Sequence, residues 1–207
     1  MFGRLMLAVR RMKWVRQYIR PLYYRLNPRK SLMRADSYAR DALVELVGSL
    51  PSNRQMVMVE VGSFRGESAE IFLNTNRFSR IYCIDPWKNF YDKNDWASFS
   101  NMAKVERDFD QRVGGDERVV KVKGTIDTFF ERYPNITLDF AYIDGCHTYD
   151  AVKHDLTKIM TTSRPRVAVA GHDFLEQEWE GVTRAVKECI GSPDAVFPDT
   201  SWVKYLG

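Results

Sequence analysis

Residues 56–66, which read MVMVEVGSFRG, constrain the fold of this chain more than any other segment. An apolar run of strand length ends at Val61, and the glycines Gly62 and Gly66 follow it before a helix-like stretch begins. Glycine tolerates a positive φ angle and lets a ligand come close to the backbone. The first turn of a helix adds free N–H groups and a positive dipole end. The segment therefore predicts a strand that carries its end to a small ligand through a tight turn.

The rest of the chain alternates between apolar, strand-like runs and helix-like segments. We expect strands at residues 55–61, 80–84, 119–122, 138–143 and 167–170, and a closing pair at residues 195–197 and 202–205. Helices are expected at residues 36–48, 67–74, within 88–113, and at 125–132, 149–160 and 179–190. Such alternation indicates a parallel sheet covered on both faces. The expected fold is α/β: a Rossmann-like, doubly wound, mostly parallel sheet with helices on both faces and a C-terminal antiparallel strand.

Acidic residues stand at the ends of four of the expected strands. They are Glu60, Asp85, Asp144 and Asp173. Right-handed crossovers between parallel strands place the strand-end loops on one edge of the sheet, which is where open α/β sheets bind ligands. We therefore expect the four acids to gather in one cleft at that edge.

The charge of the chain is divided unevenly along its length. Residues 1–35 hold ten basic residues and no acid, whereas residues 36–207 hold 21 basic and 27 acidic residues, a net charge of −6. We expect a basic helical N-terminal arm at residues 1–35 and one domain at residues 36–207 that binds no nucleic acid. The arm has three interpretations: it packs on the domain, residues 1–30 contact an anionic membrane or partner, or it is a removable targeting segment.

The cysteines and the hydropathy indicate in which cellular compartment the protein is expected. Cys83, Cys146 and Cys189 form no CxxC pair, so we expect neither a disulfide nor a zinc site, and Cys83 reads as a core residue. The cytoplasm is the expected location, with membrane association through the arm as the alternative. No apolar stretch reaches the roughly 20 residues of a membrane span. The arm and the closing strand pair could each mediate a homodimer.

Four motifs in order carry a resemblance to a known family. Residues 59–66 read VEVGSFRG, residues 84–87 read IDPW, residues 139–149 read DFAYIDGCHTY, and residues 171–174 read GHDF. The set resembles class I S-adenosylmethionine-dependent methyltransferases, in the branch of small-molecule O-methyltransferases that includes macrocin and related sugar methyltransferases. The resemblance implies methyl transfer from S-adenosylmethionine to a hydroxyl of a small molecule or a sugar.

The resemblance also implies a donor pocket. Its residues are Glu60, Gly62, Ser63, Gly66, Asp85, Trp87, Gly124, Thr125 and Asp144. The glycines would admit the amino-acid tail, Glu60 would hold the ammonium group directly or through water, and Asp85 could accept both ribose hydroxyls. Trp87 either borders the adenosine or is a core aromatic, and Gly124 stands where the family contacts adenine. A dinucleotide site is disfavoured because the loop lacks the GxGxxG spacing.

On the acceptor side, two mechanisms stay open. In related metal-dependent enzymes, acids at these strand ends hold magnesium, so the resemblance implies that Asp144, His172 and Asp173 bind Mg²⁺ or Mn²⁺. Alternatively, His147 or His172 is a general base oriented by Asp144 or Asp173. His147 could instead cap the following helix, and His154 reads as a surface residue. The catalytic candidates are thus His147, His172 and Asp144.

The remaining features refine this hypothesis. Methyl transfer needs alignment more than covalent catalysis, since the sulfonium is already activated, and this agrees with the absence of a Ser-His-Asp or Cys-His pattern. The aromatic residues within 88–107 form either a lid or acceptor wall, or a covering helix. The alternative function is a membrane-recruited or scaffold protein on the same fold that uses the basic arm.

Overall fold

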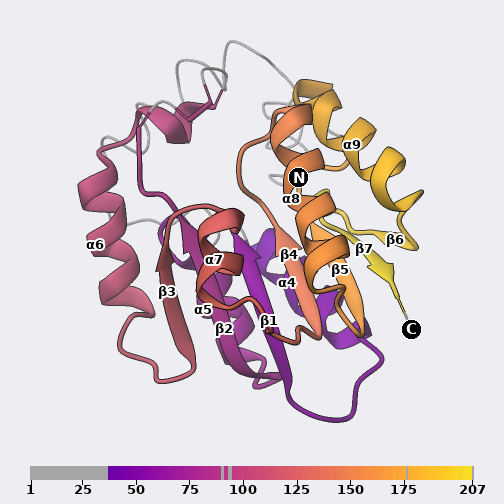
Figure 1. The fold of residues 1–207 in the computed structure, drawn as a ribbon, viewed down its shortest axis with the longest axis horizontal. Coiled ribbons are helices and arrows are strands. Elements are labelled where there is room, and N and C mark those ends of the chain that lie inside the picture. The colour runs from indigo at the N-terminus through magenta and orange to yellow at the C-terminus, as the bar shows by residue number, and fades with distance from the viewer. Residues whose placement is uncertain (1–36, 90, 93–94, 176, 207) are drawn as a thin grey trace, which may run out of the picture. The chain divides into compact units, whose positions relative to one another are not determined.

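The computed structural model describes residues 37–206, apart from residues 90, 93–94 and 176 (Figure 1). The N-terminal arm expected at residues 1–35 lies outside the described residues. Within the described residues, no helix combines the length and the apolar character needed to cross a membrane.

Seven strands of the described region form one sheet in the order β3-β2-β1-β4-β5-β7-β6. They are β1 (Met56–Val61), β2 (Phe78–Asp85), β3 (Val119–Lys123), β4 (Phe140–Ile143), β5 (Ala168–Gly171), β6 (Ala195–Val196) and β7 (Trp202–Tyr205). Strands β1 to β5 pair in parallel, β7 is antiparallel to β5, and β6 is antiparallel to β7. The predicted mostly parallel sheet with an antiparallel C-terminal strand is therefore confirmed.

Helices cover both faces of this sheet (Figure 1). The α-helices are α4 (Ser37–Ser49), α5 (Glu67–Asn74), α6 (Met102–Arg112), α7 (Ile126–Arg132), α8 (Tyr149–Thr162) and α9 (Glu180–Ile190). Two short 3₁₀ helices, η2 (Trp96–Phe99) and η3 (Gln177–Trp179), lie in loops at strand ends. The aromatic segment after β2 contains η2 and α6, as the loop-and-helix prediction for residues 88–113 stated.

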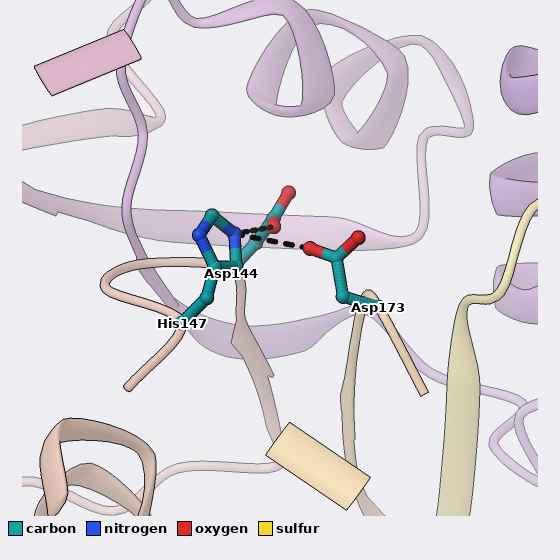
Figure 2. Close-up of side chains that lie close together, drawn as sticks. All are labelled: Asp144, His147 and Asp173. Atoms are coloured by element: carbon teal, nitrogen blue, oxygen red, sulfur yellow. Dashed lines mark ion pairs between the residues drawn. The ribbon is translucent and has the colours of Figure 1, made fainter. Parts of the chain in front are cut away.

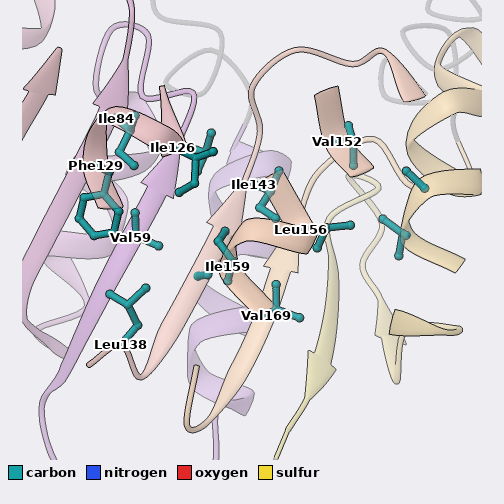
Figure 3. Close-up of a cluster of buried hydrophobic side chains, with 14 of the residues drawn as sticks. Val59, Ile84, Ile126, Phe129, Leu138, Ile143, Val152, Leu156, Ile159 and Val169 are labelled. Atoms are coloured by element: carbon teal, nitrogen blue, oxygen red, sulfur yellow. The ribbon is translucent and has the colours of Figure 1, made fainter. Parts of the chain in front are cut away.

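Alternation along the strands divides the core between the two faces. Val59 and Val61 join a large apolar cluster with side chains of α7, α8 and α9 (Figure 3). On the opposite face, Phe72 of α5 packs edge-on against Phe78 and Tyr142, with ring centroids 5.9 and 5.1 Å apart. Because successive side chains of a strand point to opposite faces, each strand supplies both cores.

The register of the parallel strands brings their carboxyl ends to one level. Val61 of β1 is paired with Ile84 of β2 and with Ile143 of β4, and Ile143 is paired with Gly171 of β5. The residues that follow these pairs therefore emerge side by side at one edge of the sheet. They are Gly62, Asp85, Asp144 and His172.

Candidate active site

The turn after β1 depends on glycine because it lies against the end of β4. Gly62 has φ 92°, and a Cβ atom added to it would lie 2.1 Å from the carbonyl oxygen of Asp144. Gly66 has φ 74° and precedes α5, and its N–H donates to the Ser63 carbonyl at 2.7 Å. The glycine loop thus brings the backbone of β1 directly onto the residue that ends β4.

Glu60 is completely buried beneath this loop. The Ser63 hydroxyl donates to its Oε2 at 2.6 Å, and the Ser68 hydroxyl of α5 donates to its Oε1. Burial raises the pKa of Glu60 to about 7. These two hydrogen bonds hold the glycine loop to the first turns of α5. The expectation that Glu60 holds the donor's ammonium group, directly or through water, stays a prediction.

Asp85 fastens the glycine loop from the end of β2. Its Oδ2 accepts the Phe64 N–H at 2.8 Å and its Oδ1 accepts the Trp87 N–H at 2.6 Å. Burial raises the pKa of this carboxyl, against the effect of the two N–H donors. Each carboxylate oxygen offers about two acceptor positions, so one on each oxygen remains for a ligand hydroxyl.

Trp87 completes the attachment of the loop. Its indole Nε1 donates to the Phe64 carbonyl at 2.8 Å, and its ring packs on Phe109 of α6 with centroids 5.0 Å apart. Only 5% of Trp87 is exposed, as the core interpretation of this residue expects. The same residue also lines a cavity beside Asp85, so the two interpretations of Trp87 are compatible.

That cavity has a volume of about 620 Å³ and lies over the ends of β2 and β3. Its lining consists of Pro86, Trp87, Lys88, Asn89, Met102, Ala103, Glu106 and Lys123. The volume is within the range of small-molecule sites, which is about 300–1,000 Å³. Gly124 joins the edge of this region, since its N–H donates to the Asp85 carbonyl at 3.0 Å. Thr125 is the N-cap residue of α7.

A second group of polar side chains lies at the ends of β4 and β5. Figure 2 shows Asp144, His147 and Asp173 directed toward one another. The Nε2 of His147 lies 3.0 Å from Asp173 Oδ2 and 3.9 Å from Asp144 Oδ1. One nitrogen or oxygen atom from each residue lies within 4.8 Å of the others, which is close enough for the three residues to share a metal ion.

His172 lies on the other side of Asp173 and is not part of this set. Its Nδ1 is 3.2 Å from Asp173 Oδ1, and its Nε2 is 3.8 Å from Oδ2 of Asp199, in the turn before β7. The predicted ligands Asp144 and Asp173 are thus brought together, but the histidine beside them is His147. The sequence could not distinguish the two histidines, because each stands close to one of the acids in the motifs: His147 follows Asp144 by three residues and His172 directly precedes Asp173.

The carboxylates control the charge of both rings. Burial disfavours the charged form of His147, but Asp144 and Asp173 outweigh burial and raise its pKa well above the usual range. Burial likewise opposes the charge on His172, but Asp173 raises its pKa to about 10. Burial would raise the pKa of Asp173, and the two histidines instead hold it far below its usual value. Without a bound cation, the neighbouring carboxylates therefore favour the protonated form of both rings.

Three residues that the sequence analysis did not single out surround the histidines. Trp179 of η3 stacks on His147 with centroids 4.4 Å apart. Asp95 approaches His147 from the segment after β2, and Asp199 approaches His172. They come from distant parts of the chain, and no motif marks them. His154 is a surface residue, as expected, and pairs with Asp127 at 2.9 Å.

A mostly parallel sheet with a glycine loop after β1 and acids at the ends of β2 and β4 defines the class I methyltransferase fold. A family model described as a methyltransferase domain matches residues 59–174, which is more than half of the 207-residue chain. The chain therefore belongs to this methyltransferase family and is an S-adenosylmethionine-dependent methyltransferase. A search of curated protein sequences finds no match.

Solved structures share the fold at low sequence identity. A calicheamicin methyltransferase, CalS11, is 20% identical with a TM-score of 0.62, and the match covers 99% of this chain and 91% of that one. An apo structure of CalS11, described as a TDP-rhamnose 3'-O-methyltransferase, is 19% identical with a TM-score of 0.58 and covers 99% and 92%. Spermidine synthase from Thermotoga maritima is 11% identical with a TM-score of 0.55, covering 86% and 62%.

The residues present fit S-adenosylmethionine. The glycine loop lies at the carboxyl edge of the sheet, against the end of β4, and Asp85 holds it through the Phe64 N–H. The open hollow lined by Pro86 and Trp87, which directly follow Asp85, has the volume of a small-molecule site, and the Asp85 carboxylate has acceptor positions for a diol.

Proposed function

We propose that this enzyme transfers the methyl group of S-adenosylmethionine to a hydroxyl of a small molecule, and that the acceptor is a sugar or a glycosylated compound. The observation that carries the proposal is the polar group of Asp144, His147 and Asp173 directly beside the glycine loop. A hydroxyl acceptor needs groups that bind its oxygen and take its proton. The TDP-rhamnose 3'-O-methyltransferase activity named for CalS11 agrees with a sugar acceptor.

On the donor side, we propose that Asp85 binds the ribose hydroxyls and that the loop from Gly62 to Gly66 receives the amino-acid tail. The adenine would lie in the cavity between Trp87 and Lys123, close to Gly124 and Thr125. The Ser63 hydroxyl donates to Glu60, and this hydrogen bond keeps the glycine loop in its shape. We therefore propose that both residues support the donor site. In this arrangement the sulfonium would lie between the glycine loop and Asp144.

On the acceptor side, we propose that Asp144, His147 and Asp173 hold a divalent cation, Mg²⁺ or Mn²⁺. Two carboxylates and one imidazole suit a first-row divalent ion, and the three donor atoms lie close enough to share one. A bound cation would lower the pKa of an acceptor hydroxyl and orient it. His172 would not bind the cation in this arrangement, but its Nδ1, 3.2 Å from Asp173 Oδ1, would help to hold the Asp173 carboxylate in place.

The metal-free alternative needs a neutral imidazole, because only an unprotonated nitrogen can accept the hydroxyl proton. The acids around His147 raise its pKa well above the usual range, which opposes that role in the absence of a cation.

The main task of the chain is then alignment: Asp144 and Asp173 position the acceptor oxygen in line with the methyl carbon and the sulfur, and Trp179 shields the site from water.

Four measurements test the proposal. Calorimetry with S-adenosylhomocysteine should show binding at micromolar concentration, and no binding at millimolar concentration would contradict the donor site. Mn²⁺ binding, followed by electron paramagnetic resonance, should be lost in Asp144→Asn and Asp173→Asn. Mass spectrometry of reactions with nucleotide sugars and hydroxylated small molecules should detect a gain of one methyl group. Full activity after exhaustive chelation would exclude an essential cation.

For the basic arm, we propose a peripheral contact with anionic membranes through residues 1–30. The support is the charge pattern, ten basic residues and no acid in residues 1–35. Removal of residues 1–30 should abolish co-sedimentation with vesicles that contain phosphatidylserine. If co-sedimentation is unchanged, the arm does not bind membranes.

A further inference from the structure

The ring of His147 presents two very different environments to its two nitrogens. Nε2 faces Asp144 and Asp173, but the buried Nδ1 has no hydrogen-bond partner among the described residues. Trp179 stacks on the ring and thereby restricts its rotation. A buried N–H without a partner is costly, so a nearby acceptor gains by approaching it.

Asp95 is the carboxylate that faces this unpartnered nitrogen. Its Oδ2 lies 3.8 Å from His147 Nδ1. The same oxygen accepts the Tyr91 hydroxyl at 2.8 Å, and Oδ1 accepts the Ala97 N–H at 2.9 Å as the N-cap of η2. The carboxylate is thus fixed from two sides, with one oxygen aimed at the ring. An approach of about 1 Å would make a hydrogen bond of ordinary length.

We propose that Asp95 is a positioning residue for the methyl-transfer site: it accepts the Nδ1–H of His147 and thereby keeps Nε2 directed at Asp144 and Asp173. The proposal rests on the function proposed above, but it holds for either mechanism. A histidine that binds a metal through one nitrogen usually donates the other N–H to a carboxylate or carbonyl, which fixes its tautomer and orientation. A histidine base needs the same orientation.

Tyr91 belongs to the same arrangement. Its hydroxyl donates to the oxygen of Asp95 that faces His147, so it holds that oxygen in place. Tyr91 and Asp95 follow β2, whereas His147 follows β4 and Trp179 follows β5. The His147 ring is thus positioned by the segments that follow β2 and β5, in addition to its own loop after β4. The role of the segment after β2 is to fix the orientation of this ring.

Nuclear magnetic resonance of the histidine rings tests the proposal without an acceptor. The chain has three histidines, so ¹⁵N spectra of the rings are simple, and the variant His147→Gln assigns the His147 signals. With S-adenosylhomocysteine and Mg²⁺ bound, the Nδ1 proton of His147 should exchange slowly with water. Asp95→Ala should abolish this protection, and Tyr91→Phe should weaken it. The control Asp110→Asn removes a carboxylate of α6 that pairs with Lys121, and it should change nothing.

A second measurement separates positioning from folding. Asp95→Asn keeps a side-chain oxygen for the N-cap of η2, since asparagine caps as well as aspartate. It should fold and bind S-adenosylhomocysteine with unchanged affinity, while the affinity for Mn²⁺ falls about 10- to 100-fold. The proposal is overturned if the Nδ1 proton of the wild type is unprotected, or if Asp95→Ala leaves it protected. A wild type that does not bind S-adenosylhomocysteine would instead contradict the proposed function, and ring spectra recorded without this ligand would still decide the role of Asp95.

Discussion

His147 Nε2 lies 3.0 Å from Asp173 Oδ2, and this ion pair joins the loop after β4 to the loop after β5. The two residues belong to neighbouring parallel strands whose last residues, Ile143 and Gly171, are paired in register. The register of the sheet therefore brings these two loops side by side. The ion pair also places one carboxylate between two imidazoles, because His172 Nδ1 is 3.2 Å from the other oxygen of Asp173.

Asp173→Asn should lower the pKa of both histidines in the metal-free protein. The substitution removes the negative charge that holds each ring in its protonated form, and an opposite charge at this distance changes a pKa by about 1–3. Nuclear magnetic resonance titration of the ring signals measures this. Asp127→Asn, which removes the carboxylate paired with His154, is the matched control and should leave the titration of His147 and His172 unchanged. Unchanged titration of His147 and His172 would contradict the assigned ion pairs.

Glu60→Gln should change how stability depends on pH. Because the folded pKa of Glu60 is raised from 4.5 to about 7, its stabilising effect is fully present below pH 4.5 and is lost as the pH rises through 7. The difference between the two pKa values corresponds to about 3 kcal/mol. Urea unfolding between pH 4 and pH 9 should show that the variant gains stability relative to the wild type over this window. A pH-independent difference would argue against a buried, neutral Glu60.

Asp85→Asn should weaken S-adenosylhomocysteine binding about 10- to 100-fold, because hydrogen bonds to a charged group contribute about 1.5–3 kcal/mol. Calorimetry measures the change. Asp116→Asn, which removes a surface carboxylate paired with Arg118, is the control and should bind normally. An unchanged dissociation constant for Asp85→Asn would remove Asp85 from the donor site.

Gly62→Ala should destabilise the domain by about 3 kcal/mol or more, because its methyl group would overlap the Asp144 carbonyl and its φ is positive. Gly48→Ala is the matched comparison. Gly48 lies in α4, and an added Cβ would meet nothing within 4 Å, so alanine should stabilise by about 0.5–1 kcal/mol. Chemical unfolding measures both, and equal effects at the two positions would show that the close contact at Gly62 is wrong.

Local patterns predicted the secondary structure and the edge that carries the site. Residues 67–74 were expected as a helix and form α5 with the same bounds, and the apolar runs around β1 and β4 were found as parallel strands. Helical and strand periodicity depend on neighbouring residues, so they can be recognised in one sequence. β2 begins at Phe78, earlier than expected, because its pairing with Met56 of β1 extends the strand.

The directions and contacts of the site side chains could not be predicted from local patterns. The motif around Glu60 predicted a ligand contact, but it gave no sign of the hydrogen bonds from Ser63 and Ser68, which only the structure shows. Asp95 and Asp199 reach the histidines from loops whose course depends on packing, so no local pattern identified them.

The amino-acid order alone determined that glycine and acidic residues would emerge together at the carboxyl ends of parallel strands, since hydrophobic alternation and crossover handedness require it. Only the tertiary structure decided that His147, and not His172, faces Asp144. Stacking on Trp179 and the pairing of both rings with Asp173 orient the two imidazoles, and these contacts join residues from separate loops. Ring orientation is a property of such long-range packing, and adjacency in the chain carries no information about it.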